Sequence, residues 1–340
     1  MIVCKIAFVG FLTAVIALPM KQPVWHLIQN TEGTFHLVNI EPDQLSKESV
    51  RSDPDPLFDP ENDMSFHLFT RNNPSSAQFL VIGNPASIAG SNFNPAHPTR
   101  FTIHGWGSSA NDGMNSAIRD RLLAMGEYNV IYVDWSIGAA SPDYAVARQQ
   151  VGPAGFGLGR LIDQLIEHAN ANPNDMNVIG FSFGAHVAGN AGKHLNGQLN
   201  SIIALDPAGP LFHPGQEDSV SPQDGVYVET IMTNAGQVGI DWPVGQANFY
   251  PNGGRTQPGC GPDTGGGCAH VRAPTYFIES IGTSVPFRAT RCASYDEILE
   301  GLCTPSGADA NMGGEPSNQG RGVDGIYFLT TNAASPFAQG

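Results

Sequence analysis

The sequence predicts an α/β fold with a mostly parallel central sheet and helices on both of its faces. Short apolar runs separated by helical patterns recur from about residue 60 onward, and strands that alternate with helices are typical of parallel sheets. The chain has 340 residues, of which 41% are hydrophobic and 14% are charged. This composition is sufficient for one large buried core and is too apolar for a disordered chain.

The first residues are typical of a secretory signal peptide. Lys5 precedes an apolar run of about a dozen residues, and the small residues Val15 and Ala17 follow it. We therefore expect residues 1–17 to be a signal peptide and the protein to be secreted; a buried N-terminal helix is the alternative. Neither this run nor a later one reaches the roughly 20 apolar residues of a membrane-spanning helix, so no transmembrane anchor is expected.

Residues 18–59 are rich in proline and acidic residues and show no sustained periodicity. We interpret them as an extended N-terminal segment and a candidate propeptide, followed by a single domain over residues 60–340. Within that domain, apolar runs predict strands at residues 100–106, 129–136, 177–182, 201–209 and 226–233.

The segment between the second and third of these runs predicts a helix. Its spacing places Leu161, Leu165 and His168 on one face. After about residue 235 the chain becomes rich in glycine and proline. Long segments of this kind inside a compact domain are usually binding loops.

A glycine-flanked serine follows the predicted strand "NVIG". In "GFSFG", Ser182 lies between Gly180 and Gly184, and a predicted helix begins near Ala185. The G-x-S-x-G pattern alone is weak evidence, but between a strand and a helix it is the nucleophile elbow of the α/β-hydrolase fold. The two glycines allow the strand and helix backbones to approach closely, which leaves the serine hydroxyl exposed for attack.

A serine nucleophile needs an acid and a base, which this fold supplies in the order serine, acid, histidine. Asp206 follows the apolar run "SIIAL", and the alternative for it is a turn aspartate before proline. Only His213 and His270 lie beyond it in the chain. We favour His270 as the base, because a disulfide at nearby Cys268 would fix the segment that presents it.

Two backbone N–H groups are candidates for the oxyanion hole. Trp106 lies in "TIHGWGSS", a predicted strand end followed by a His-Gly turn, and Phe183 follows the candidate nucleophile. His104 in the same turn is interpreted as a structural residue that holds the turn.

Without residues 1–17, four cysteines remain: Cys260, Cys268, Cys292 and Cys303. An even number is consistent with two disulfides in an oxidising compartment. Three pairings are possible, and we favour local pairing along the sequence. Zinc binding is the alternative, which the absence of C-x2-C spacing disfavours. The formal net charge of −15 disfavours nucleic acid and strongly anionic membranes as partners.

Together, the motifs "GFSFGAHVAG", "ALDPAGP", "IHGW", "YPNGG" and "CAHVRA" resemble the pancreatic lipase family, particularly its insect secreted members, over residues 60–339. The resemblance implies that Ser182 is the nucleophile, Asp206 the acid and His270 the base. It also implies an oxyanion hole from Trp106 and Phe183. The implied reaction is hydrolysis of a lipid ester at a micelle or membrane surface without a cofactor.

The resemblance also has implications for the lid, for calcium binding and for dependence on colipase. In the family, Cys260 and Cys268 correspond to the bridge that closes the lid, and here they enclose only "GPDTGGG"; the spacing of Cys292 and Cys303 fits another family disulfide. So short a lid predicts little activation at lipid surfaces. No C-terminal β-sandwich is expected, and therefore no colipase dependence. A family calcium site would fall near Asp224, where a capped turn is the alternative.

The sequence leaves three functions open. We expect hydrolysis of acylglycerols, as in triacylglycerol lipases. The short lid also resembles that of phospholipases A1, which cleave the sn-1 ester of phospholipids. The alternative from another class is a catalytically silent lipid-binding or yolk-type homologue.

Overall fold

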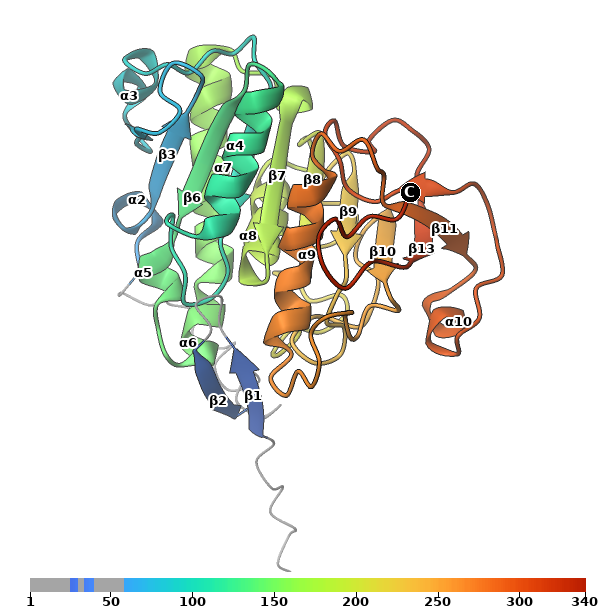
Figure 1. Ribbon diagram of the computed structural model, residues 1–340. Helices are drawn as coiled ribbons and strands as arrows, with labels where there is room; N and C mark the ends of the chain where they lie inside the picture. The colour runs from blue at the N-terminus through green and yellow to red at the C-terminus, as the bar shows by residue number, and fades with distance from the viewer. Residues whose placement is uncertain (1–24, 30–33, 40–57) are drawn as a thin grey trace, which may run out of the picture.

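The computed structural model describes residues 25–29, 34–39 and 58–340 (Figure 1). The predicted signal peptide and most of the predicted N-terminal extension lie outside the described residues. Within the described part of the chain, no helix is long and apolar enough to cross a membrane.

The main sheet has eleven strands. In chain order they are β3 (Ser65–Phe69), β4 (Gln78–Leu80), β5 (Thr99–Ile103), β6 (Asn129–Asp134), β7 (Met176–Phe181), β8 (Ser201–Leu205), β9 (Val228–Ile231), β10 (Ala247–Pro251), β11 (Arg288–Cys292), β12 (Ala310–Asn311) and β13 (Gly325–Leu329). They pair in the order β12-β11-β13-β10-β9-β8-β7-β5-β6-β3-β4. The pairs from β6 to β13 are parallel, and the edge strands pair antiparallel. The predicted mostly parallel sheet is confirmed.

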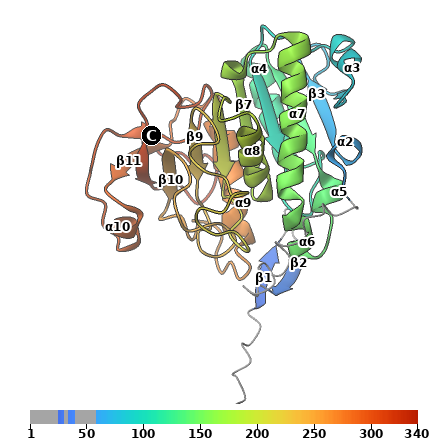
Figure 2. The ribbon, with the colours of Figure 1, turned by 180° about the vertical axis from the view of Figure 1, so that it is seen from behind.

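Helices cover both faces of this sheet. They are α2 (Pro60–Asp63), α3 (Pro85–Ala89), α4 (Gly113–Met125), α5 (Ser136–Ala139), α6 (Tyr144–Gln149), α7 (Val151–Ala169), the 3₁₀ turn η1 (Pro173–Asp175), α8 (Phe183–His194), α9 (Gly267–Ser280) and α10 (Tyr295–Leu299). Helices α4 and α9 lie on one face and α7 and α8 on the other (Figures 1 and 2). Neighbouring residues of the central strands face opposite sides: Val178 packs in the core beneath α7 and α8, and Ile179 in the core beneath α4 and α9.

The five predicted strands are all present as β5 to β9. The predicted helix is α7, in which Leu161 and Leu165 are buried. His168, placed on the same face by its spacing, is exposed, because it lies in the last turn of the helix, beyond the core. The glycine-rich segment after residue 235 is not one long loop, since it contains β10 and α9.

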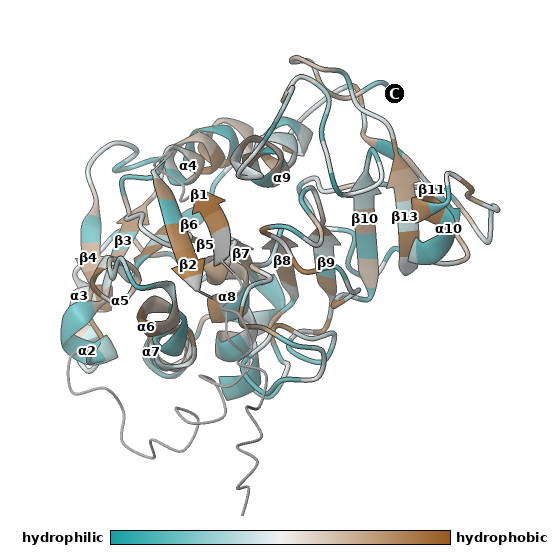
Figure 3. Cartoon of the chain, turned by 90° about the horizontal axis from the view of Figure 1, so that it is seen from below, coloured by the Kyte–Doolittle hydropathy of each residue, from teal (hydrophilic) through white to brown (hydrophobic). Residues whose placement is uncertain are grey.

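The N-terminal extension is also not free of regular structure. Residues Trp25–Gln29 form β1 and Phe35–Asn39 form β2, and the two strands pair antiparallel as a separate small sheet. Figures 1 and 2 place this pair beyond the carboxyl ends of the parallel strands. In Figure 3, which looks toward those ends, it lies over the middle of the main sheet, between α4 and α6.

A buried carboxylate, that of Glu229, lies on β9. Glu229 is fully buried, and it accepts hydrogen bonds from Tyr227 Oη, Asn318 Nδ2 and Gly313 N. Desolvation outweighs these hydrogen bonds and raises the pKa of Glu229 from 4.5 to about 7. The folded protein therefore binds this proton more tightly than the unfolded chain does.

This raised pKa predicts a loss of stability with rising pH. The contribution of Glu229 to the free energy of unfolding should be fully present below pH ~4.5 and fall by roughly 3 kcal/mol as pH rises to ~7. In Glu229→Gln this fall should be absent. Urea unfolding of both proteins at pH 5 and pH 7.5 measures the difference. An equal pH dependence in the two proteins would show that Glu229 is ionised throughout.

Candidate active site

Ser182 lies in the sharp turn between β7 and α8. Its backbone has φ 57° and ψ −121°, a left-handed conformation that strains a non-glycine residue by about 1–3 kcal/mol. The N–H of Ser182 donates to Leu205 O on the neighbouring strand β8 (3.0 Å). The turn is therefore held by the sheet in spite of its strain.

The two glycines that flank Ser182 are required by close backbone contacts. A Cβ atom at Gly180 would lie 2.1 Å from Gly184 O, and one at Gly184 would lie 2.4 Å from Ile103 O. Only glycine allows α8 to begin this close to β7 and β5. Both glycines thus act on the position of Ser182 through the backbone.

Asp206 follows β8 directly and is completely buried. Its Oδ1 accepts the backbone N–H groups of Thr233 (2.7 Å) and Asn234 (3.0 Å). Its Oδ2 lies 2.6 Å from Nδ1 of His270. Because an ionised carboxylate only accepts hydrogen bonds, Nδ1 is the donor, and the other ring nitrogen of His270, Nε2, remains available as a base.

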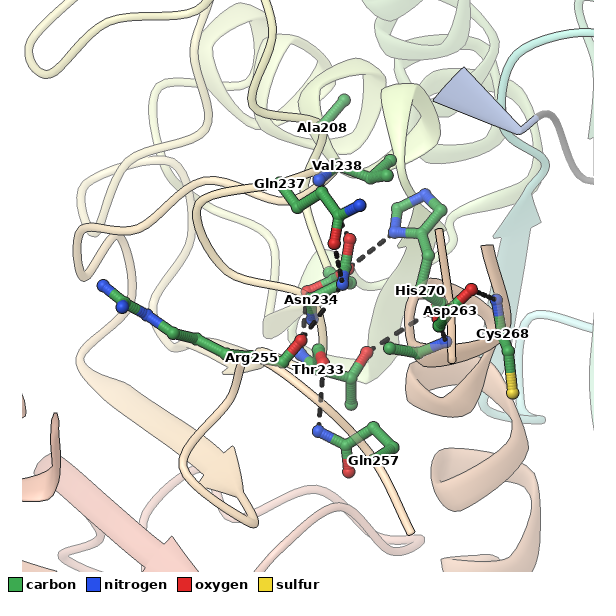
Figure 4. Close-up of polar contacts among 12 residues, drawn as sticks. Ala208, Thr233, Asn234, Gln237, Val238, Arg255, Gln257, Asp263, Cys268 and His270 are labelled. Carbon is green, nitrogen blue, oxygen red and sulfur yellow. Dashed lines mark hydrogen bonds and ion pairs between the residues drawn. The ribbon is translucent and has the colours of Figure 1, made fainter. Parts of the chain in front are cut away.

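His270 lies in the first turn of α9, which is anchored on two sides (Figure 4). The disulfide Cys260–Cys268 closes the preceding loop, and the carboxylate of Asp263 accepts the N–H groups of Cys268 (3.2 Å) and Ala269 (2.7 Å). The imidazole packs against the ring of Phe181 at 4.5 Å between centroids. His270 is therefore placed beside the end of the strand that carries Ser182.

Among the described residues, no hydrogen bond joins Ser182 to His270. This is common in enzymes without substrate, where catalytic hydrogen bonds are often long and shorten in the substrate complex. The two residues still share one edge of the sheet, because parallel strands and the segments after them end there together.

Hydrogen bonds of His104 hold the turn that contains Trp106. Nε2 of the buried His104 accepts the N–H of Trp135 (3.2 Å), so Nδ1 carries the proton and donates to Gly105 O (2.9 Å). The indole N–H of Trp106 donates to Ser141 O (2.8 Å). These contacts agree with the structural role predicted for His104.

The backbone N–H groups of Trp106 and Phe183 have no hydrogen-bond partner in the described part of the chain. Trp106 is in the turn after β5, and Phe183 is the first residue of α8, where helix N–H groups are unpaired. Two free donors beside Ser182 match what a developing oxyanion needs.

Several further residues support Asp206 and His270 and were not predicted from the sequence. Gln257 is buried, and its Nε2 donates to Thr233 O (2.9 Å) and Pro251 O (2.9 Å), which fixes the loop after β9 (Figure 4). Thr233 and Asn234 act on Asp206 through backbone N–H groups, which have no residue-type signature. Gln257 stands in "QPGC", just before Cys260, and this nearness to the disulfide is the sequence signal that points to it.

Gly239 packs directly against the carboxylate of Asp206. A Cβ atom at this position would lie 2.7 Å from Asp206 Oδ1 and 2.9 Å from Asp206 Cγ. Gly239→Ala should therefore displace the carboxylate and reduce kcat by about 100-fold, since misplacements near 1 Å cost about this much. Gly152→Ala is the control, because its Cβ would meet nothing within 4 Å. Equal kcat values for ester hydrolysis in the two variants would contradict the importance of this contact.

The remaining predicted residues lie outside the group formed by Ser182, Asp206 and His270. His213 is exposed, and the second disulfide, Cys292–Cys303, lies at the edge of the sheet near α10. The two disulfides of the structure are the local pairs favoured by the sequence. Among the described residues, one group has the spacing of metal ligands, Cys260, Asp263 and Cys268, but both of its sulfurs belong to a disulfide.

The carboxylate of Asp224 is already paired. It accepts a hydrogen bond from Lys193 Nζ (2.6 Å), and from the N–H (2.8 Å) and hydroxyl (2.7 Å) of Ser221. The capped turn, the alternative considered from the sequence, accounts for these contacts.

Known proteins similar to this chain are lipases and lipase-related proteins. The family model described as Lipase matches residues 39–337. Pancreatic lipase-related protein 2 of Cavia porcellus is 34% identical over 286 residues, and the human protein of that name is 33% identical over 303. Pancreatic triacylglycerol lipase of Equus caballus is 30% identical over 302 residues. Each match covers 81% of this chain but only 64–65% of the relative.

Among solved structures, the α/β hydrolase enzyme MGS-M1 from a Medee basin deep-sea metagenome library is similar over 52% of this chain and 66% of that chain. The sequence identity is 20% and the TM-score 0.31, which is too low to bear on the function.

Proposed function

This chain belongs to the lipase family, and we propose on that basis that it is a serine carboxylic ester hydrolase that releases fatty acids from acylglycerols. The observation that carries the proposal is the buried pair of Asp206 and His270, joined at 2.6 Å, beside a serine held in a strained turn. The relative named pancreatic triacylglycerol lipase, of whose length this chain covers 65%, supports acylglycerols as the substrate class.

In the proposed mechanism, Ser182 Oγ attacks the carbonyl carbon of the ester while His270 Nε2 takes its proton. Asp206 holds the imidazole in the tautomer that can accept this proton and stabilises the imidazolium. The N–H groups of Trp106 and Phe183 bind the oxyanion. His270 then protonates the leaving alcohol, and water, activated by His270, releases the fatty acid from the acyl-enzyme.

Phospholipase A1 activity is the second candidate, and one observation favours it. Cys260 and Cys268 are eight positions apart, and the seven residues between them include no large apolar side chain. This loop cannot form an amphipathic helix over the site, so it leaves room for a polar headgroup.

Positional product analysis distinguishes the two substrates. The protein is incubated with trioleoylglycerol and, separately, with a phosphatidylcholine that carries different acyl chains at sn-1 and sn-2. Release of oleate with no product from phosphatidylcholine is the expected result. Release of the sn-1 fatty acid at a comparable rate would instead support phospholipase A1.

We also propose that the protein is secreted after removal of residues 1–17, with residues 18–59 preceding the catalytic domain. The two disulfides support an oxidising compartment. N-terminal sequencing of protein recovered from the medium of expressing eukaryotic cells should give a start at Leu18. A start near residue 60 would show that the extension is a propeptide.

A further inference from the structure

The pair of strands β1 and β2, called the N-terminal flap below, contacts the turn that provides a candidate oxyanion donor. Ile28 and Val38 are buried in the same apolar cluster as Trp106 and Phe183. The imidazole of His36 packs on the indole of Trp106 at 4.4 Å between centroids. One face of the flap therefore covers the oxyanion side of the site.

The flap also contacts the opposite side of the site. The ring of Phe35 approaches Gly265 so closely that a Cβ atom there would lie 2.5 Å from Phe35 Cε1. Gly265 belongs to the disulfide loop that precedes His270. The flap thus reaches from the Trp106 turn to the disulfide loop, on either side of the nucleophile.

With the flap in this place the reactive groups are nearly closed to solvent. Ser182 is 7% exposed and His270 is 3% exposed, so neither is accessible to a large lipid ester. Because the flap contacts segments on both sides of the site, its displacement would widen access to Ser182.

The outer face of the flap is apolar as well. Leu27 is 40% exposed, Phe35 54% and Leu37 63%, and Leu27 and Leu37 lie directly opposite each other in the strand register. A small antiparallel sheet in water normally presents polar side chains on its outer face. An exposed apolar face next to a site for lipid esters indicates a lipid partner.

The closed position also contains an unsatisfied polar atom. Nε2 of His36 is buried and has no hydrogen-bond partner among the described residues. Such a group disfavours the state that buries it. Apolar contacts therefore stabilise the closed position of the flap, and the unpaired Nε2 of His36 destabilises it. This balance is suitable for an element that must move.

We propose that the N-terminal flap is the lid of the active site, and that insertion of Leu27, Phe35 and Leu37 into an uncharged or zwitterionic lipid surface displaces it. This inference rests on the proposed function for the role of Ser182. The formal net charge of −15 disfavours an anionic surface. The flap takes the function that the small disulfide loop is too short to perform, and it makes access dependent on a lipid surface.

The direct test measures how fast Ser182 reacts with a soluble phosphonate ester, with and without vesicles of dialkyl-ether phosphatidylcholine, which contain no hydrolysable ester. We expect the wild-type protein to react at least tenfold faster with vesicles present. Vesicles of an anionic ether lipid should accelerate it less. An unchanged rate with the phosphatidylcholine analogue would overturn the inference, as would secreted protein that begins near residue 60.

Two double variants test the two faces of the flap. Ile28→Asp/Val38→Asp places carboxylates in the apolar cluster, so the flap should detach and phosphonylation should be fast without vesicles. Leu27→Asn/Leu37→Asn should abolish the vesicle effect. The matched control is Leu299→Asn/Leu302→Asn, because these leucines are 40% and 57% exposed near α10, away from the flap (Figure 1); it should keep the vesicle effect.

The outcomes separate this inference from the proposed function. Acceleration by vesicles in a protein that hydrolyses no lipid ester would support the flap and remove the proposed activity. The protein could instead hydrolyse lipid esters while its phosphonylation rate is unchanged by vesicles and by the inner-face variant. That result would support the proposed activity and contradict the role of the flap as a lid. If the inner-face variant fails to fold, the wild-type vesicle measurement still decides.

Discussion

Replacement of Ser182 by alanine should reduce kcat for lipid ester hydrolysis by about 10⁶-fold, the effect of removing a serine nucleophile from a complete triad. Ser182 lies in the strained turn between β7 and α8, at the edge of the sheet where Asp206 and His270 are joined. Without the oxygen nucleophile no acyl-enzyme can form. The rate is measured on emulsified trioleoylglycerol, with far-UV circular dichroism to confirm the fold.

Ser116→Ala is the matched control, because this serine is partly exposed on α4 and its hydroxyl donates to Gly113 O. It should retain wild-type activity. If Ser182→Ala hydrolyses lipid at the wild-type rate, the serine mechanism is wrong. If the wild-type protein hydrolyses no lipid ester, the silent lipid-binding alternative is favoured instead.

Asp206→Asn should reduce kcat by about 10⁴-fold, with a smaller change in KM. The asparagine amide has nearly the shape of the carboxylate, but its oxygen must accept the N–H groups of Thr233 and Asn234. The amide NH2 group then faces His270 Nδ1, which must become an acceptor. The imidazole proton moves to Nε2, where it prevents His270 from acting as a base toward Ser182.

The control for this variant is Asp309→Asn, whose carboxylate pairs with Arg288 on the surface. It should leave kcat unchanged, since exposed ion pairs contribute little. A kcat for Asp206→Asn within tenfold of wild type would show that the 2.6 Å hydrogen bond does not control the tautomer of His270.

The central strands could be predicted from the sequence because each is a short, fully buried apolar run. Helix α9 was not predicted, because Pro274 interrupts it and glycines precede it, so no helical periodicity is visible. The candidate site could be predicted because serine, acid and base have a fixed order, and parallel strands end at one edge of the sheet.

The residues that surround the candidate site could not be predicted from the sequence, for two physical reasons. The donors to Asp206 are backbone N–H groups of Thr233 and Asn234, and any residue can supply such a group. The contacts of the flap with Trp106 and Gly265 join segments far apart in the chain. The short disulfide loop alone predicted little dependence on lipid surfaces, whereas the flap inferred here predicts a clear dependence.

The most direct test of the account is to identify the residue that reacts with a phosphonate ester. Wild-type protein is inhibited with the reagent in the presence of lipid, digested and mapped by mass spectrometry. We predict one adduct, on Ser182, with none in Ser182→Ala and slow formation in Asp206→Asn. Loss of lipid hydrolysis with the adduct on another residue, or with no adduct, would contradict the assignment of Ser182 as the nucleophile.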